Sequence, residues 1–280
     1  MICVTGINSS GTNWLSKLFY LALGGEGKFM IALGGEEKFV IEPWSPLAHG
    51  YEEVHLYHPE YWEMAEANLG LLGRWPGRNE LPTAEGRARI SGALTALENT
   101  WPKAVGFKTL YFHYWEAMRE RWPDIKFVSI RRDLQGWLGS LARRQGLLIH
   151  MFAGTGTWTY PLAEPPPWLP MARAAAEDGQ TPDKWFPLLK AAYYRHVEYE
   201  WRDAHGPADS LRTSFALLAG SWDMEAAKIL EHCGLPVPGD EELFQWAQSR
   251  RRRWADKDYR REDVFGVIEL LQRRGDCRCD

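Results

Sequence analysis

The sequence has few cysteines, no long hydrophobic run and no large excess of charge of either sign. Its four cysteines, Cys3, Cys233, Cys277 and Cys279, are spread over 280 residues, which is too few for the disulfide framework of a small secreted scaffold. No apolar stretch approaches the roughly 20 residues of a membrane helix. A strand-like run directly after Met1 does not fit a signal peptide. These absences predict a soluble, reduced, cytoplasmic protein.

The charge balance excludes two further classes of protein. Thirty-three basic and 37 acidic residues give a formal net charge of −4, so the chain is not a generally basic nucleic-acid coat. With 45% hydrophobic and 25% charged residues, it is also not a disordered acidic protein. We therefore expect a single folded domain over residues 1–280, with neither nucleic acid nor membrane as a partner; the oligomeric state stays open.

Strand-like and helix-like segments alternate along the chain. We expect strands at 2–5, 103–109, 125–130 and 210–215, with helices after each and from about 187 to 203. Such alternation predicts an α/β fold with a mostly parallel central sheet flanked by helices. Residues 22–29 recur almost unchanged at 32–39, which we interpret as a local duplication, such as a hairpin, without chemistry of its own.

A loop of small residues joins the first strand to the first helix. Gly6 and Gly11 have the spacing of a phosphate-binding loop, and a helix that begins at such a loop presents unpaired N–H groups to an anion. A Walker A loop continues with Lys and Ser/Thr, where this chain has Thr12 and Asn13. Hydrolysis of ATP or GTP is therefore a poor interpretation, and the alternatives are another phosphate ligand or an ordinary turn.

The segment 8–15, NSSGTNWL, resembles the P-K/R-S-G-T-x-W-L signature of PAPS-dependent sulfotransferases. In that family the segment cradles the 5′-phosphate of the sulfuryl donor. The resemblance implies a P-loop NTPase-like sulfotransferase fold. The chain departs from the signature at Ser9, where the family has lysine or arginine. The donor-binding residues implied by the resemblance are Asn8, Ser9, Ser10, Gly11, Thr12, Asn13 and Trp14.

Two later segments resemble the parts of the same family that bind the 3′-phosphate. The strand KFVSIR is followed by Arg132, and Ser140 lies eight residues further on. Arginine holds phosphate with two parallel hydrogen bonds, and Asp133 is a good helix cap. The basic run 250–253 includes Arg251, which the resemblance assigns to the family's late basic segment. The stretch from Leu211 to Pro236 resembles a third family segment, without its acidic pair.

Transfer of a sulfuryl group requires a cation near the bridging oxygen and a base for the acceptor proton. Lys108-Thr109 resembles the K-T/S that the family places beside the donor sulfate, so Lys108 is the predicted catalytic cation. One branch of the family has histidine at the next position, where this chain has Leu110. The nearest histidine, His113, is the candidate base. Rival bases are His55, His58, Glu52 and Glu53.

The resemblance implies that the protein transfers a sulfuryl group from PAPS to a hydroxyl or amine of a small-molecule or glycan acceptor, giving PAP. No metal is implied. The Pro/Trp-rich span 154–168, with Trp158, Tyr160 and Trp168, suits a loop over an apolar or aromatic acceptor. Two alternatives stay open: a P-loop small-molecule kinase, and a catalytically inactive protein that binds PAP or another nucleotide.

Overall fold

The computed structural model of the chain describes residues 1–7, 10–23, 39–41, 84, 88, 91, 94–95, 98, 105–109, 115–143, 182–248 and 261–274. These residues fall into two compact units. Unit 1 combines Met1–Arg131 with Gly206–Arg250, and unit 2 combines Arg132–His205 with Arg251–Asp280. The expected single domain over 1–280 stays a prediction.

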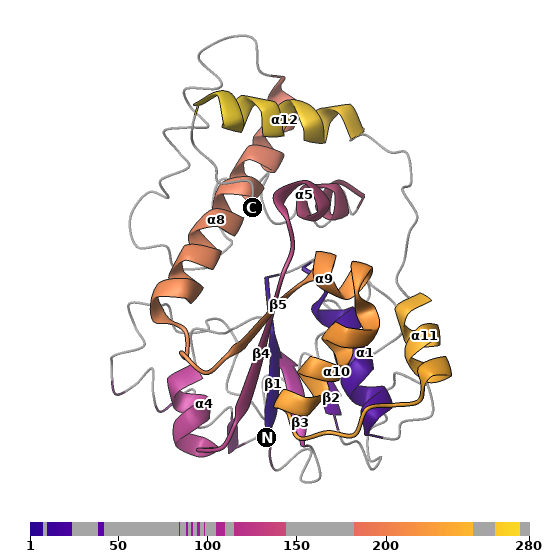
Figure 1. Ribbon diagram of the computed structural model, residues 1–280. Helices are drawn as coiled ribbons and strands as arrows, with labels where there is room; N and C mark the ends of the chain where they lie inside the picture. The colour runs from indigo at the N-terminus through magenta and orange to yellow at the C-terminus, as the bar shows by residue number, and fades with distance from the viewer. Residues whose placement is uncertain are drawn as a thin grey trace, which may run out of the picture. The chain divides into compact units, whose positions relative to one another are not determined.

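Unit 1 is built on a five-stranded sheet with the order β2-β3-β1-β4-β5, in which every pair of neighbours is parallel. The predicted α/β class with a parallel central sheet flanked by helices is therefore confirmed (Figure 1). The strands are β1 (Ile2–Thr5), β2 (Phe39–Ile41), β3 (Gly106–Thr109), β4 (Lys126–Arg131) and β5 (Leu211–Ser214). The helices of unit 1 are α1 (Thr12–Ala22), α4 (Trp115–Arg121), α9 (Phe215–Gly220), α10 (Trp222–His232) and α11 (Asp240–Gln248).

Four of the five strands lie where the sequence predicts them, with bounds shifted by up to three residues at one end. The sequence did not predict strand β2, which begins at Phe39, the last residue of the duplicated segment, and pairs in parallel with β3. The interpretation of the duplication as a hairpin stays a prediction. The rest of the second copy, and most of the first, lie outside the described residues.

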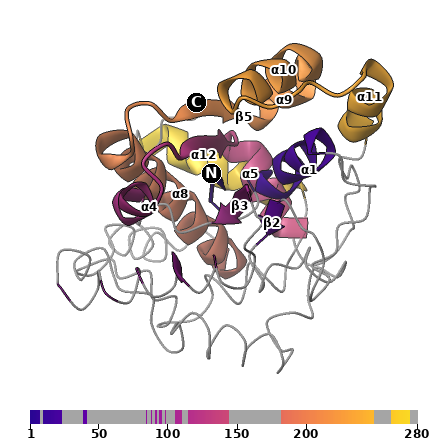
Figure 2. The same ribbon diagram turned by 90° about the horizontal axis from the view of Figure 1, so that it is seen from below.

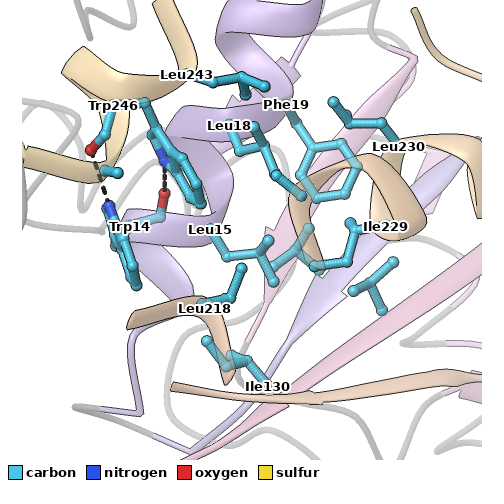
Figure 3. Close-up of a cluster of buried hydrophobic side chains, with 14 of the residues drawn as sticks. Trp14, Leu15, Leu18, Phe19, Ile130, Leu218, Ile229, Leu230, Leu243 and Trp246 are labelled. Carbon is cyan, nitrogen blue, oxygen red and sulfur yellow. Dashed lines mark hydrogen bonds between the residues drawn. The ribbon is translucent and has the colours of Figure 1, made fainter. Parts of the chain in front are cut away.

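One face of the sheet is covered by α1, α9, α10 and α11, which Figure 2 shows grouped together. Alternate residues of the strands point to this face because side chains in a strand alternate sides. Val4, Val128 and Ile130 pack there against Leu15 and Phe19 of α1 and against residues of α10 and α11 (Figure 3). The first turns of α1, directly after the loop that follows β1, are therefore anchored in the core of unit 1.

The opposite face of the sheet is covered by α4. Cys3 lies in register with Phe107 and Phe127, so these three side chains share that face. The Cys3 thiol contacts the Met118 sulfur at 4.0 Å, and the Phe107 ring lies 5.6 Å from the Trp122 ring, between centroids. Cys3 is thus a buried core residue of a sheet that is covered on both sides.

Unit 2 consists of helices in its described part: α5 (Leu134–Arg143), the short 3₁₀ helix η4 (Asp183–Trp185), α8 (Phe186–His205) and α12 (Arg261–Arg274). The Trp137 side chain of α5 is fully buried and its ring packs on Tyr194 of α8. The Trp185 indole N–H donates to the Asp263 carboxylate of α12 at 2.9 Å. No helix in the described part of either unit is long and apolar enough to cross a membrane.

Candidate functional site: two strand-to-helix turns and a buried lysine

The turn between β1 and α1 is compact and buried. The Ser10 hydroxyl donates to the Ile7 carbonyl at 2.7 Å, and the Ser10 backbone N–H donates to the same carbonyl at 3.1 Å. Ser10 is fully buried, and Thr12 is 4% exposed. The two hydrogen bonds close a tight turn directly before the helix, as the small residues in the sequence predict.

Glycine is required at both ends of this turn for steric reasons. Gly11 has φ of +104°, a backbone conformation that side chains disfavour. A Cβ added at Gly11 would lie 2.7 Å from the Phe215 ring and 3.2 Å from Ile130 Cδ1. A Cβ at Gly6 would lie 2.4 Å from the Ser10 hydroxyl and 2.9 Å from the Ile130 carbonyl. The G-x4-G spacing therefore reflects close packing of the turn against β4 and α9.

In the same turn, the start of α1 has a glycine as its N-cap residue. Gly11 occupies the N-cap position and has no side chain that could cap the helix, and no side-chain cap bond is found among the described residues there. The first N–H groups of a helix have no partner within the helix and carry the positive end of its dipole. A phosphate oxygen is a suitable acceptor for them.

The structure places the other predicted residues of this loop unevenly. Asn8 and Ser9 lie outside the described residues, and Asn13 is described only as part of the α1 backbone. Trp14 is 7% exposed and lies in the core, with its ring stacked on Trp246 at 4.7 Å between centroids. Its indole N–H donates to the Trp246 carbonyl at 3.1 Å, and the Trp246 N–H donates to the Trp14 carbonyl at 2.8 Å (Figure 3). Core packing accounts for Trp14, and its role toward a cofactor stays a prediction.

Lys108 is buried near the carboxyl end of β3. It is 4% exposed and lies in register with Val4 of β1, whose side chain belongs to the core under α1. Register partners in parallel strands point to the same face, so the Lys108 side chain is on the α1 side of the sheet. The next residue, Thr109, pairs with Thr5, after which β1 enters the loop. A buried ammonium group next to the strand that feeds an anion loop suits a cation that stabilises transferred negative charge.

In unit 2, Arg132 lies just before α5 and Ser140 lies within that helix. Asp133 caps the helix, since its carboxylate accepts from the Gly136 N–H at 2.6 Å. Gly136 and Ser140 are four residues apart and therefore neighbours on the helix surface. A Cβ at Gly136 would lie 3.1 Å from Arg132 Nε, so the arginine side chain lies over the first turn of α5. Ser140 is 8% exposed. The structure thus places the Arg132 side chain over the first turn of α5 and Ser140 one turn further along the helix.

Three residues that the sequence analysis did not select belong to this second turn. Gly136 leaves room for the Arg132 side chain. On α8, the Arg195 guanidinium donates to the Arg132 carbonyl, and the Tyr199 hydroxyl accepts from the Arg132 N–H. Glycine destabilises a helix by about 1 kcal/mol relative to alanine, so a glycine in a helix indicates that another group packs closely against the backbone there. Arg195 and Tyr199 carried no such signal, because their partner is backbone 63 and 67 residues away.

Several predicted residues lie outside the described part of the chain. They include the candidate base His113, the rival bases Glu52, Glu53, His55 and His58, and Arg251. The predicted acceptor-loop residues Trp158, Tyr160 and Trp168 lie there as well. In the third family-like segment, Ser214 caps α9 by accepting from the Leu217 N–H at 3.1 Å. That segment has a structural role that its resemblance did not specify.

Other reactive groups in the described residues do not form a second centre. Burial raises the pKa of the Cys233 thiol to about 12, so this thiol is protonated at neutral pH and is a poor nucleophile. Among the described residues, no three His, Cys, Asp or Glu side chains gather into a group that could hold a metal ion.

Comparison with known proteins adds a similarity at the level of the fold. No protein-family model matches the chain, and no curated protein matches it. Among solved structures, the chain is similar to the sulfotransferase STF9 from Mycobacterium avium, with a TM-score of 0.44 and 15% sequence identity. The alignment covers 98% of this chain and 76% of that chain. The likeness between the two proteins is a distant one of fold.

Proposed function

We propose that this protein is a PAPS-dependent sulfotransferase, which transfers the sulfuryl group to a hydroxyl or amine acceptor and releases PAP. The observation that carries the proposal is the turn between β1 and α1. Its two glycines are required by packing, and Gly11 leaves the N–H groups of α1 without a side-chain cap. The turn resembles the family's 5′-phosphate loop in sequence, apart from Ser9, and lacks the Walker A lysine, which supports its assignment to a phosphate other than that of a Walker A nucleotide.

The described residues fit the donor in three respects. Ser10, Gly11 and Thr12 would hold the 5′-phosphate through backbone N–H groups at the helix start. Arg132 and Ser140 would hold the 3′-phosphate, as a guanidinium over the first turn of α5 and a hydroxyl within that helix. Lys108 would place a positive charge where negative charge develops on the leaving group. PAPS itself supplies the activated sulfuryl group, and the protein orients it and neutralises charge.

Calorimetric titration with PAP, 5′-AMP and Mg·ATP tests the proposal. We expect micromolar binding of PAP and much weaker binding of 5′-AMP, because AMP lacks the 3′-phosphate that Arg132 and Ser140 would hold. Equal affinity for PAP and AMP would remove the sulfotransferase assignment. Preferential, Mg²⁺-dependent binding of ATP would favour a kinase, and PAP binding without turnover of PAPS on any acceptor would favour an inactive nucleotide-binding protein.

Two substitutions separate donor binding from transfer. Arg132→Ala should weaken PAP binding by about 2–4 kcal/mol, the loss expected for a charged hydrogen-bonding group on a phosphate. Arg131→Ala, the neighbouring arginine at the end of β4, is the matched control and should change PAP affinity little. Lys108→Met keeps the buried aliphatic stem and removes the charge, so transfer should be lost while PAP stays bound. Normal PAP affinity in Arg132→Ala would contradict the 3′-phosphate assignment.

A further inference from the structure

The backbone of Arg132 is held from both sides by side chains of α8. Its N–H donates to the Tyr199 hydroxyl at 3.1 Å. Its carbonyl accepts two hydrogen bonds from the Arg195 guanidinium, from Nε at 2.9 Å and from Nη2 at 2.7 Å. Arg132 thus has both of its main-chain polar groups bound by one helix.

These contacts exist because Arg132 lies between two regular elements. Strand β4 ends at Arg131 and helix α5 begins at Leu134, so neither element's hydrogen-bond pattern extends to Arg132. Buried backbone groups in such a position require other partners. Arg195 and Tyr199 are four residues apart on α8, and the Arg195 guanidinium stacks on the Tyr199 ring at 4.8 Å. The two side chains therefore bind the Arg132 backbone as a pair, and we call this pair the α8 clamp.

Burial of the α8 clamp has a higher free-energy cost than a purely structural contact requires. Arg195 is 4% exposed and Tyr199 is 7% exposed, and burying a guanidinium requires strong hydrogen bonds in compensation. The planar fork of arginine suits a fixed two-bond contact, which restricts the orientation of its partner more than a lysine would. The clamp therefore fixes the direction in which the Arg132 side chain leaves the backbone.

We infer that Arg195 and Tyr199 are positioning residues for Arg132, and that they set its guanidinium beside Ser140 for recognition of a ligand's 3′-phosphate. The inference rests on the proposed function, because it takes Arg132 and Ser140 as phosphate ligands. It deepens that function by tying the preference for a 3′-phosphorylated nucleotide to two buried side chains. Neither of them belongs to the motif that suggested the site. Gly136, which leaves room for Arg132 Nε at the first turn of α5, completes the arrangement.

The test compares PAP and 5′-AMP binding in Tyr199→Phe, measured by calorimetry on the full chain. Removal of the hydroxyl leaves the Arg132 N–H without its acceptor, so PAP should bind about 5- to 30-fold more weakly, a range typical of one buried hydrogen bond. Affinity for 5′-AMP should not change. Tyr194→Phe is the matched control, since it removes a hydroxyl from another buried tyrosine of α8, whose ring packs on Trp137. It should leave the PAP to AMP ratio unchanged.

A double-mutant cycle distinguishes positioning from a general structural role. Once Arg132→Ala has removed the guanidinium, adding Tyr199→Phe should weaken PAP binding no further. Arg195→Lys keeps the charge but loses the two-bond fork, and should also lower the PAP to AMP ratio. This second variant keeps the inference testable if Tyr199→Phe folds poorly.

The outcomes separate the inference from the function on which it rests. Wild-type protein that binds PAP and 5′-AMP equally would overturn the proposed function and the inference with it. Wild-type preference for PAP that Tyr199→Phe and Arg195→Lys both retain would overturn the inference alone. Variants that weaken PAP and AMP binding equally would also overturn it, because a loss shared by both nucleotides reflects the fold rather than the 3′-phosphate.

Discussion

Two turns carry the predicted phosphate ligands, and they are stabilised in opposite ways. The turn between β1 and α1 is tightly packed: Gly11 has a positive φ, and Phe215 and Ile130 also leave no room for a side chain there. The turn after β4 is held by polar side chains, since Arg195 and Tyr199 bind both main-chain groups of Arg132. The first turn combines tight packing around its glycines with the local hydrogen bonds of Ser10, whereas the second depends on donors and acceptors from a distant helix.

The difference indicates whether each turn mainly supports the stability of the fold or the discrimination between ligands. A turn embedded in the core of unit 1 shares its stability with the whole sheet, so damage to it should lower the free energy of unfolding. A turn held by two side chains can lose its geometry while the surrounding helices stay packed. We therefore expect changes in the first turn to appear mainly as lost stability, and changes in the second mainly as lost discrimination between ligands.

Gly11→Ala should have the largest effect. A side chain at φ of +104° is strained, at about 1–2 kcal/mol, and the Cβ would press on Phe215 at 2.7 Å, where overpacking adds about 1–3 kcal/mol. The free energy of unfolding should fall by about 2–5 kcal/mol in urea titrations. Gly220→Ala is the control, because nothing lies within 4 Å of a Cβ there. Equal stability of the two variants would contradict the packing account of the first turn.

Much of both turns could be predicted from the sequence. The glycine-containing turn before α1, the strand before Arg132 and the helix that contains Ser140 are local patterns, and local patterns can be recognised in a chain. Strand β2 could not be found in this way, because three residues form a strand there only by pairing with β3. Trp14 illustrates the same limit: its partner Trp246 is 232 residues away, and only the folded chain shows that it lies in the core.

The α8 clamp could not be predicted from the sequence, for a related reason. Arg195 and Tyr199 contact backbone atoms, and a backbone partner leaves no pattern in the sequence around Arg132. What the sequence did contain was Gly136, whose cost in a helix indicates that another group comes close. The residues proposed to touch a ligand were thus easier to predict than the residues that position them.

Trp14→Phe should have an intermediate effect and tests the boundary of the first turn. The change removes the N–H that donates to the Trp246 carbonyl and some buried surface, so the free energy of unfolding should fall by about 1–3 kcal/mol. Trp246→Phe removes the reciprocal donor and should cost a similar amount. If Trp14 is a core residue, both variants bind PAP as the wild type does. Weaker PAP binding in Trp14→Phe alone would restore its predicted contact with the nucleotide.

Gly136→Ala should have the smallest effect on stability, and it makes in the second turn the change that Gly11→Ala makes in the first. Alanine favours the helix by about 1 kcal/mol, while its Cβ would press on the Asp133 carboxylate at 2.7 Å and weaken a cap of about 1 kcal/mol. The gain in helix propensity and the weakening of the cap therefore nearly cancel in the free energy of unfolding. The same Cβ lies 3.1 Å from Arg132 Nε, so the guanidinium must move, and we expect PAP to bind about 3- to 10-fold more weakly with AMP unaffected. A loss of stability comparable to that of Gly11→Ala, without a change in the PAP to AMP ratio, would show that both turns are held by packing.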